Sequence, residues 1–364
     1  MFANLPINQQ KFIKRFVIAI ITVYVMATVL SAVLLRSKPP ELASTPVAQI
    51  HSDAKTPETA PSASPTTEPI KIHTGIYLDE IENVSIKDSY WTTTFFVWFT
   101  WKGDKSLDPG KSFQLVSAQI LKKEIQDSYT SPDGTNYQCY KIVAKMTKFF
   151  NTTYMPLDQH VLDIYIEDPA LDDSKLVYVV DPASNINPAI ELPGFKIEGF
   201  SQDSQPHLYP TTFGDPRLSN GDFSSYSQYD YAIQFKRAGL GFFFKLFIGM
   251  FAGVLLTLGS FFIRPADTGP RYGIPSAAYF GAVGNTYMVN SLLPPSGLYG
   301  LTDLVTGLGL LTITLCVGAT LLSTYYYLRK DDKEFSKAID SASWKAFGAC
   351  YFIVNIALLM MVPR

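Results

Sequence analysis

The sequence predicts an all-β extracellular sandwich followed by an all-α four-helix transmembrane domain, with an extra transmembrane helix at the N-terminus. Three observations lead to this fold class. Short runs of β-branched and aromatic residues fill the middle of the chain, long apolar runs fill its last third, and one more apolar run lies close to the first residue. Apolar residues make up 47% of the 364 residues and charged residues only 17%, which is lean in charge for a wholly soluble protein.

The N-terminal apolar run extends from Phe16 to Leu35, and its length of about 20 residues matches a hydrocarbon core roughly 30 Å thick. Lys11, Lys14 and Arg15 precede it, so residues 1–36 are predicted to form a cytoplasmic N-terminus and a membrane anchor. A cleaved signal segment is the alternative. The run is long for such a segment, however, and no A-x-A site ends it.

Two different segments separate this anchor from the last third of the chain. Residues 37–70 are rich in Pro, Ser, Thr and Ala and have no hydrophobic period. They cannot bury enough apolar surface to offset their ordering entropy, so we predict a tether. Residues 71–237 contain eight strand-like runs separated by polar or Gly/Pro-bearing turns, which predicts a β-sandwich. One of these runs is FQLVSAQILKKEI, residues 113–125.

The last part of the chain, residues 238–364, is predicted to cross the membrane four times. The four runs are Leu240–Ile263, Arg271–Pro295, Leu301–Leu328 and Trp344–Val362. The second run is thick with Gly, Ser, Asn and Thr, yet it must span, because only then do both basic loops lie on the cytoplasmic side. We therefore expect a multi-pass protein of the plasma (inner) membrane, with the sandwich on the periplasmic or extracellular side and short loops in the cytoplasm.

No enzyme site is visible in the sequence. G-x-S-x-G, P-loop, H-E-x-x-H and C-x-x-C patterns are absent, and the four histidines are scattered. His160 and Asp163 lie three apart on a predicted strand and point to opposite faces, so they make a poor metal pair. We expect no catalytic residue, metal or cofactor, and the net charge of -2 does not indicate a nucleic-acid partner. One acidic group could bind a cation, sense protons or simply form a solvated strand end: Asp163, Glu167, Asp168, Asp172 and Asp173.

Several motifs are similar, in sequence order, to those of one known superfamily. FVWFTWKGDKSL resembles its second strand, with Trp101 and Lys102 matching and Gly103 replacing an acid. YMPLDQH resembles its signature loop, LPGFKIEGF its ninth-strand region, and YDYAIQFKRAG its last strand before the channel helices. RYGIPS resembles the start of the pore helix in the anion-selective branch, and LLPPSGLYGLTDLVTGLGLL the loop and helix after it.

From roughly Ile70 to Val362 the chain thus resembles the pentameric ligand-gated ion channels, the Cys-loop or Pro-loop receptors, as a divergent prokaryotic-type member without the loop cysteines. The resemblance implies a homopentameric receptor in membrane lipid. In it, an unknown small-molecule ligand, sensed by the sandwich, gates a pore for an inorganic ion lined by the helix at about 272–293. The alternative is a non-conducting membrane sensor or scaffold of the same architecture. A third possibility is an unrelated β-domain transporter or assembly factor.

The residues expected to line the pore share one helix face, because they recur at spacings of three and four. They are Gly273, Ala277, Phe280, Gly284, Met288 and Ser291. Phe280 is the only bulky ring of this set near the middle, and five copies would form a hydrophobic constriction. Arg271, at the cytoplasmic mouth, would favour anions. Small residues at this spacing also suit a helix–helix contact, and Arg271 could be only a positive-inside anchor.

The resemblance also assigns residues to coupling and to ligand binding. Coupling is assigned to Pro156, Leu157, Asp158, Arg237, Pro294, Pro295 and Tyr299. Asp158 is expected to pair with Arg237 or the adjacent Lys236, either to transmit gating or only to hold the fold. Ligand binding is assigned to Phe96, Tyr209, Tyr226 and Tyr229. Aromatic faces attract cationic amines, although most strand aromatics simply belong to a core.

Overall fold

The computed structural model describes residues 5–36, 68–214, 223–295 and 299–363, so nearly all of the predicted tether lies outside the described residues. The chain forms two compact units. The helical unit comprises residues 1–40, 151–158 and 238–364, and the β unit comprises residues 41–150 and 159–237. The loop at 151–158 therefore belongs with the helices, although strands precede and follow it.

One sheet of the β unit holds six strands, in the order β4-β5-β2-β1-β7, with β8 pairing β1. They are β1 (Ile70–Ser85), β2 (Tyr90–Lys102), β4 (Ala118–Thr130), β5 (Thr135–Thr147), β7 (Leu176–Val180) and β8 (Asn185–Ile186). Neighbouring strands run antiparallel except that β7 and β8 run parallel to β1.

The second sheet holds four strands in the order β3-β6-β10-β9. They are β3 (Gln114–Leu115), β6 (Gln159–Glu167), β9 (Phe195–Tyr209) and β10 (Ser224–Arg237), with the short helix α2 (Pro109–Ser112) just before β3. The run that the sequence showed as one strand near residues 113–125 is split between the two sheets. The split occurs at Ser117, whose φ of 54° breaks the extended backbone between β3 and β4.

The two sheets share one apolar core, to which β2 contributes the large side chains Trp91, Phe95 and Phe99. These three are fully buried, because β2 places alternate residues on the inner face of its sheet. Ile164 of β6 and Tyr231 of β10 meet them from the second sheet. The predicted β-sandwich is confirmed.

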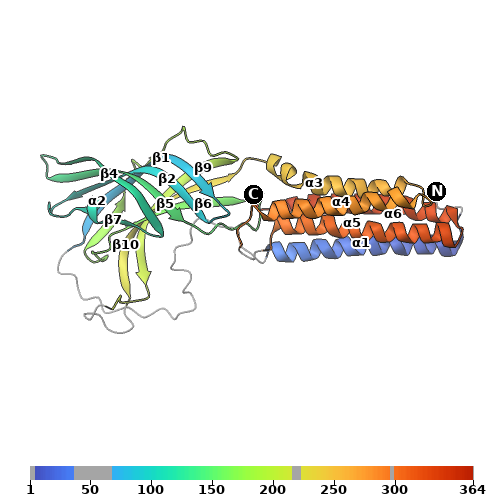
Figure 1. Cartoon of the computed structure of the whole chain (residues 1–364). Coiled ribbons are helices and arrows are strands. Elements are labelled where there is room, and N and C mark those ends of the chain that lie inside the picture. The colour runs from blue at the N-terminus through green and yellow to red at the C-terminus, as the bar shows by residue number, and fades with distance from the viewer. Residues whose placement is uncertain (1–4, 37–67, 215–222, 296–298, 364) are drawn as a thin grey trace. The chain divides into compact units, whose positions relative to one another are not determined.

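The described residues of the helical unit form five long helices. Figure 1 shows these helices lying side by side. They are α1 (Ile7–Arg36), α3 (Gly241–Gly259) with its 3-10 extension η2 (Ser260–Phe262), α4 (Thr268–Asn290), α5 (Leu301–Arg329) and α6 (Lys333–Met360). Among the described residues, α1, α3 with η2, α5 and α6 are long and apolar enough to cross a membrane. The predicted fold class, a four-helix domain with an extra N-terminal helix, is thus confirmed. Helix α4 is its polar member.

Helix α6 begins eleven residues before the apolar run that predicted it. Asp332 caps the helix by accepting a 3.0 Å hydrogen bond from the backbone N–H of Phe335. Phe335 and Ile339 are buried in a small cluster that includes Ile13 of α1. The first turns of α6 are amphipathic and pack on protein rather than on lipid, so hydropathy alone did not reveal them.

Helix α1 is built into the bundle along its length. Tyr24 is 2% exposed, and its hydroxyl lies 2.6 Å from the Thr312 hydroxyl of α5. Near its start, the Gln9 side chain donates a 2.6 Å hydrogen bond to Asp332, next to α6. A buried polar hydrogen bond between two helices is costly to leave unmade, so the contact between Tyr24 and Thr312 stabilises the packing of α1 on α5.

Candidate functional site

A cavity of about 370 Å³ opens in the β unit near the end of β9. Its lining residues are Gln114, Glu167, Pro169, Tyr209, Phe213 and Tyr226. Three aromatic rings crowd together here, with the Tyr209 centroid 5.4 Å from that of Phe213 and 5.8 Å from that of Tyr226. Aromatic faces beside a carboxylate are a combination that suits a cationic ligand.

Glu167 is the buried centre of this site, since it is only 1% exposed. Its carboxylate accepts hydrogen bonds from the Tyr209 hydroxyl at 2.7 Å and from the Gln228 amide at 2.6 Å. The His207 ring nitrogen Nδ1 contacts the same carboxylate. Burial, together with the adjacent carboxylate, raises the pKa of Tyr209, so the phenol stays protonated and donates a hydrogen bond to Glu167.

Strand register brings these residues together from three strands. Gln228 of β10 lies opposite Glu167 of β6, and Tyr226 of β10 lies opposite His207 of β9. Residues on neighbouring strands that face the same side of a sheet can therefore converge on Glu167. The sequence did single out Glu167, as part of an acidic group, but offered no means of joining it to His207.

The four predicted ligand residues separate into two pairs. Tyr209 and Tyr226 line the cavity. Tyr229 is fully buried and donates a 2.8 Å hydrogen bond to Gln202, and Phe96 on β2 lies 5.1 Å beneath the ammonium group of Lys141. The structure therefore brings neither Phe96 nor Tyr229 to this cavity. Phe213, which the sequence did not suggest, completes the aromatic set.

The loop at 151–158, which contains the first five residues of the predicted signature motif YMPLDQH (residues 154–160), contacts the rest of the helical unit at two points. The backbone carbonyl of Thr153 accepts a 2.7 Å hydrogen bond from the N–H of Leu301, at the start of α5. A Cβ on Gly300 would lie 2.7 Å from that same carbonyl oxygen, so only glycine fits this position. The Tyr154 hydroxyl donates a 3.1 Å hydrogen bond to the carbonyl of Leu35, which ties the loop to the end of α1.

The residues assigned to coupling fall in three places. Pro156, Leu157 and Asp158 lie in this loop, and Asp158 is 2% exposed. Pro294 is buried while Pro295 and Tyr299 are exposed, on either side of residues 296–298, which lie outside the described part of the chain. The Arg237 guanidinium lies 4.1 Å from the Phe195 ring centroid within the β unit. Its pairing with Asp158, which belongs to the helical unit, stays a prediction.

Helix α4 packs on its neighbours through one face only. Its buried residues include Ala278, Ala282 and Asn285, and the Asn285 amide donates a 2.8 Å hydrogen bond to the Leu246 carbonyl of α3. Gly253 of α3 allows close approach, since a Cβ there would lie 3.2 Å from the Ala278 carbonyl oxygen.

The opposite face of α4 is the stripe that the sequence assigned to a pore. All six of its residues are exposed in the single chain: Gly273, Ala277, Phe280, Gly284, Met288 and Ser291. Phe280 is the most prominent, with 75% of its surface exposed. Among the residues that the structure describes, nothing covers this face of α4.

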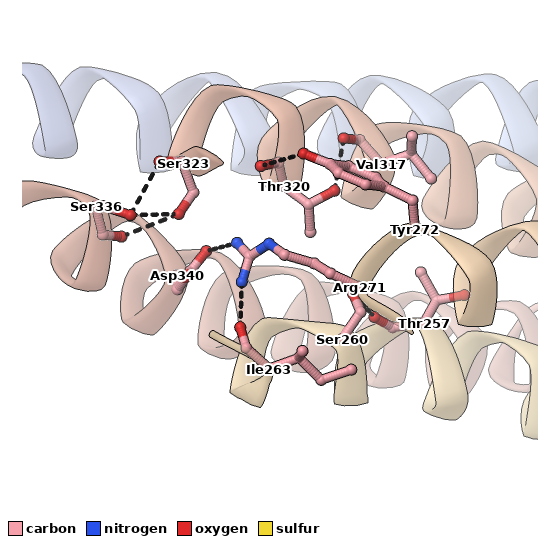
Figure 2. A network of polar contacts seen from close by, with 10 residues as sticks. All are labelled: Thr257, Ser260, Ile263, Arg271, Tyr272, Val317, Thr320, Ser323, Ser336 and Asp340. Carbon is pink, nitrogen blue, oxygen red and sulfur yellow. Dashed lines mark hydrogen bonds and ion pairs between the residues drawn. The ribbon is translucent and has the colours of Figure 1, made fainter. Parts of the chain in front are cut away.

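The position of Arg271 does not suit the anion-selecting role that the sequence suggested for it. It is 0% exposed, and its guanidinium donates hydrogen bonds of 2.6 Å to Asp340 and 2.5 Å to the Ile263 carbonyl. Figure 2 shows the side chain reaching from α4 to these two acceptors, beside the hydrogen-bonded hydroxyls of Ser323 and Ser336. An anion-selecting ring needs exposed positive charge, whereas the charge of Arg271 is neutralised inside the bundle.

Comparison with known proteins supports the resemblance seen in the motifs. The chain is 20% identical over 314 residues to a proton-gated ion channel from Gloeobacter violaceus (strain ATCC 29082 / PCC 7421), and the match covers 81% of this chain and 84% of that protein. No family model matches the chain. The chain is thus a multi-pass membrane protein that resembles the ligand-gated ion channels, and its relative is a channel rather than an enzyme. Within the described residues, no group of three or more His, Cys, Asp or Glu could hold a metal ion.

Proposed function

We propose that the protein is a homopentameric ligand-gated ion channel, in which a ligand bound by the β unit opens an ion pore lined by α4. The observation that carries this proposal is the uncovered stripe of α4. Four of its six residues are Gly, Ala or Ser, namely Gly273, Ala277, Gly284 and Ser291, and such a face gains little from contact with lipid. Copies of α4 around a water-filled path would give it a suitable environment.

The five-copy arrangement rests on the resemblance to the pentameric channels. In this arrangement Phe280 of each copy would contribute to a hydrophobic constriction that closes the pore when it dries. We do not assign ion selectivity to Arg271, because its charge is paired with Asp340 inside the bundle.

The domains have separate tasks in this proposal. Residues 1–36 supply a cytoplasmic N-terminus and an anchor that crosses the plasma (inner) membrane, and residues 37–70 tether the sandwich outside it. Residues 71–237 sense the ligand and residues 238–364 hold the pore. The retained anchor is supported by the contacts of Tyr24 with Thr312 and of Leu35 with Tyr154, which make α1 part of the bundle.

The cavity around Glu167 favours a small organic cation as the ligand. The carboxylate supplies negative charge, and the rings of Tyr209, Phe213 and Tyr226 supply the faces that attract a cation. Protons are a second candidate, favoured by the contact between His207 and the buried Glu167 carboxylate. The name of the Gloeobacter relative agrees with that second candidate.

Two measurements on the purified full-length protein test this function. Particle images in detergent should show five-fold symmetry, and protein reconstituted in planar bilayers should pass current when an organic cation such as tetramethylammonium, or acid, is added. Five-fold particles that stay silent under every ligand, pH and voltage would support the non-conducting sensor or scaffold instead. Particles that are monomers or dimers would contradict the homopentamer on which the proposal depends.

A further inference from the structure

A second cavity, of about 570 Å³, lies in the helical unit where the end of α3 and η2 meets the start of α6. Three basic and two large aromatic side chains that line this cavity are considered together. These residues are Arg264, Lys333, Lys337, Phe262 and Trp344, and Asp340 lies beside them.

The charges around this cavity favour an anion. Three cations line it against two carboxylates, Glu334 and Asp340. Asp340 is already engaged by Arg271 at 2.6 Å, so it contributes little free negative charge. Lys333 contacts Asp331 at 3.6 Å, so the free positive charge comes mainly from Arg264 and Lys337. Arg264 and Lys337 are exposed, and their charged groups can therefore reach a ligand that enters from outside.

The cavity lies beside the ends of two candidate membrane spans, where we expect the hydrocarbon of a membrane to give way to head groups. One candidate span ends at Phe262, and another begins at Lys333. The rings of Phe262 and Trp344 lie 5.5 Å apart and are 71% and 37% exposed, which leaves an apolar surface beside the cations. Tryptophan is enriched at this interface, where its ring contacts both environments.

We propose that this cavity binds the phosphate head group of an anionic phospholipid. Arg264, Lys333 and Lys337 would contact the phosphate and the acidic head group, and Phe262 and Trp344 would contact the acyl chains. A free anion would satisfy the cations but not the two rings, so the adjoining apolar surface favours the lipid. The site does not depend on whether the protein conducts ions.

The cavity wall also contains both acceptors of Arg271. Ile263 and Asp340 line the cavity, and these are the groups that hold the Arg271 guanidinium (Figure 2). Arg271 lies in the first turn of α4, so a bound head group lies next to the contacts that fix the start of this helix. The lipid would thereby adjoin the helix whose exposed stripe is proposed to line the pore.

Fluorescence quenching by brominated lipids tests the site, because Trp344 is part of it. The full chain has four tryptophans, and the other three, Trp91, Trp98 and Trp101, lie on β2. Their signal is measured in a Trp344→Phe variant and subtracted. In phosphate-free buffer, brominated phosphatidylglycerol should quench Trp344 at a several-fold lower mole fraction than brominated phosphatidylcholine does. The double variant Arg264→Gln/Lys337→Gln should lose this preference by about fivefold for each cation removed.

The matched control is Lys14→Gln/Arg15→Gln, which removes one lysine and one arginine from exposed positions near the start of α1, outside the cavity. It should keep the preference, and Lys337→Gln alone should lose about fivefold even where the double variant does not insert. Equal quenching by both lipids would overturn the proposal. So would an equal loss in the control, which indicates general surface charge only, or abolition of the preference by added inorganic phosphate, which indicates a free-anion site.

Discussion

Arg271 of α4 and Asp340 of α6, 69 positions apart in the sequence, form an ion pair inside the helical unit, with side chains 0% and 9% exposed. Both side chains are removed from water, so each charge must be balanced by the other, and the Ile263 carbonyl accepts a further hydrogen bond from Arg271. Arg271 was expected at the cytoplasmic mouth of a pore. In the structure it fixes the start of α4 to the neighbouring helix α6 and to Ile263.

Removing one partner of this pair should destabilise the protein. Asp340→Ala leaves the buried guanidinium without its carboxylate, which costs about 3–5 kcal/mol in buried pairs. The measurement is the melting temperature of the purified protein in detergent. Asp331→Ala is the control, because Asp331 is 84% exposed at its side chain and contacts Lys333 at 3.6 Å. The double variant Arg271→Met/Asp340→Leu should recover much of the loss, and a melting temperature of Asp340→Ala equal to that of the control would rule out the account.

Gly300 should be intolerant of a side chain. A methyl group there meets the Thr153 carbonyl at 2.7 Å, so Gly300→Ala must push the loop at 151–158 away from α5, at a cost of about 1–3 kcal/mol. Gly318→Ala adds the same methyl group in α5 with nothing within 4 Å and should be neutral or slightly stabilising. Thermal unfolding compares the two variants. If the loop transmits gating, Gly300→Ala also shifts the ligand concentration that gives half-maximal current. Unchanged thermal unfolding of Gly300→Ala would contradict the close contact between Gly300 and Thr153.

Glu167 should determine affinity for cations in the β unit. Glu167→Gln keeps the size of the side chain and removes its charge, so tetramethylammonium should bind at least about tenfold more weakly, given roughly 3 kcal/mol between charges 5 Å apart at an effective dielectric of 20. Isothermal titration measures this change. Asp172→Asn removes a charge that lies outside the cavity and should leave binding unchanged. Equal affinities of Glu167→Gln and the parent would remove this cavity from the proposed function.

Phe280 should close the resting pore. Phe280→Ala replaces an exposed ring with a methyl group, and the widened, wetter constriction should pass current without ligand. Tyr279→Ala, one residue along the same helix, removes a ring from a position off the six-residue stripe and should leave the resting current low. Single-channel recording of both variants provides the comparison, and a silent Phe280→Ala protein that still opens with ligand would place the gate elsewhere.

The fold class was predictable because its signals are local. The alternation of side chains along β2 and the apolar runs of α3 and α5 each lie in one continuous stretch of sequence. Such patterns can be recognised without knowing which distant residues pack against them. The start of α6 was missed because Phe335 and Ile339 pack on α1 rather than on lipid. One strand was read as continuous because nothing in the sequence marks the positive φ of Ser117.

The sites were less predictable because their residues meet across long separations. The exposed stripe of α4 followed from helical spacing. By contrast, Arg271 could be matched to Asp340, and Glu167 to His207, only through packing and strand register. A charged residue beside an apolar run resembles a surface anchor until its partner is known, which is why the anion-selecting role for Arg271 was expected.

The central claim is that the exposed stripe of α4 faces a water-filled ion path. Cysteine substitution in reconstituted protein tests this most directly: Ala277→Cys on the stripe is compared with Ala278→Cys on the buried face. A charged, membrane-impermeant thiol reagent should irreversibly change the ligand-evoked current of Ala277→Cys and leave that of Ala278→Cys and of the parent unchanged. If the current of Ala277→Cys is unaffected while the protein conducts, the stripe does not line the pore.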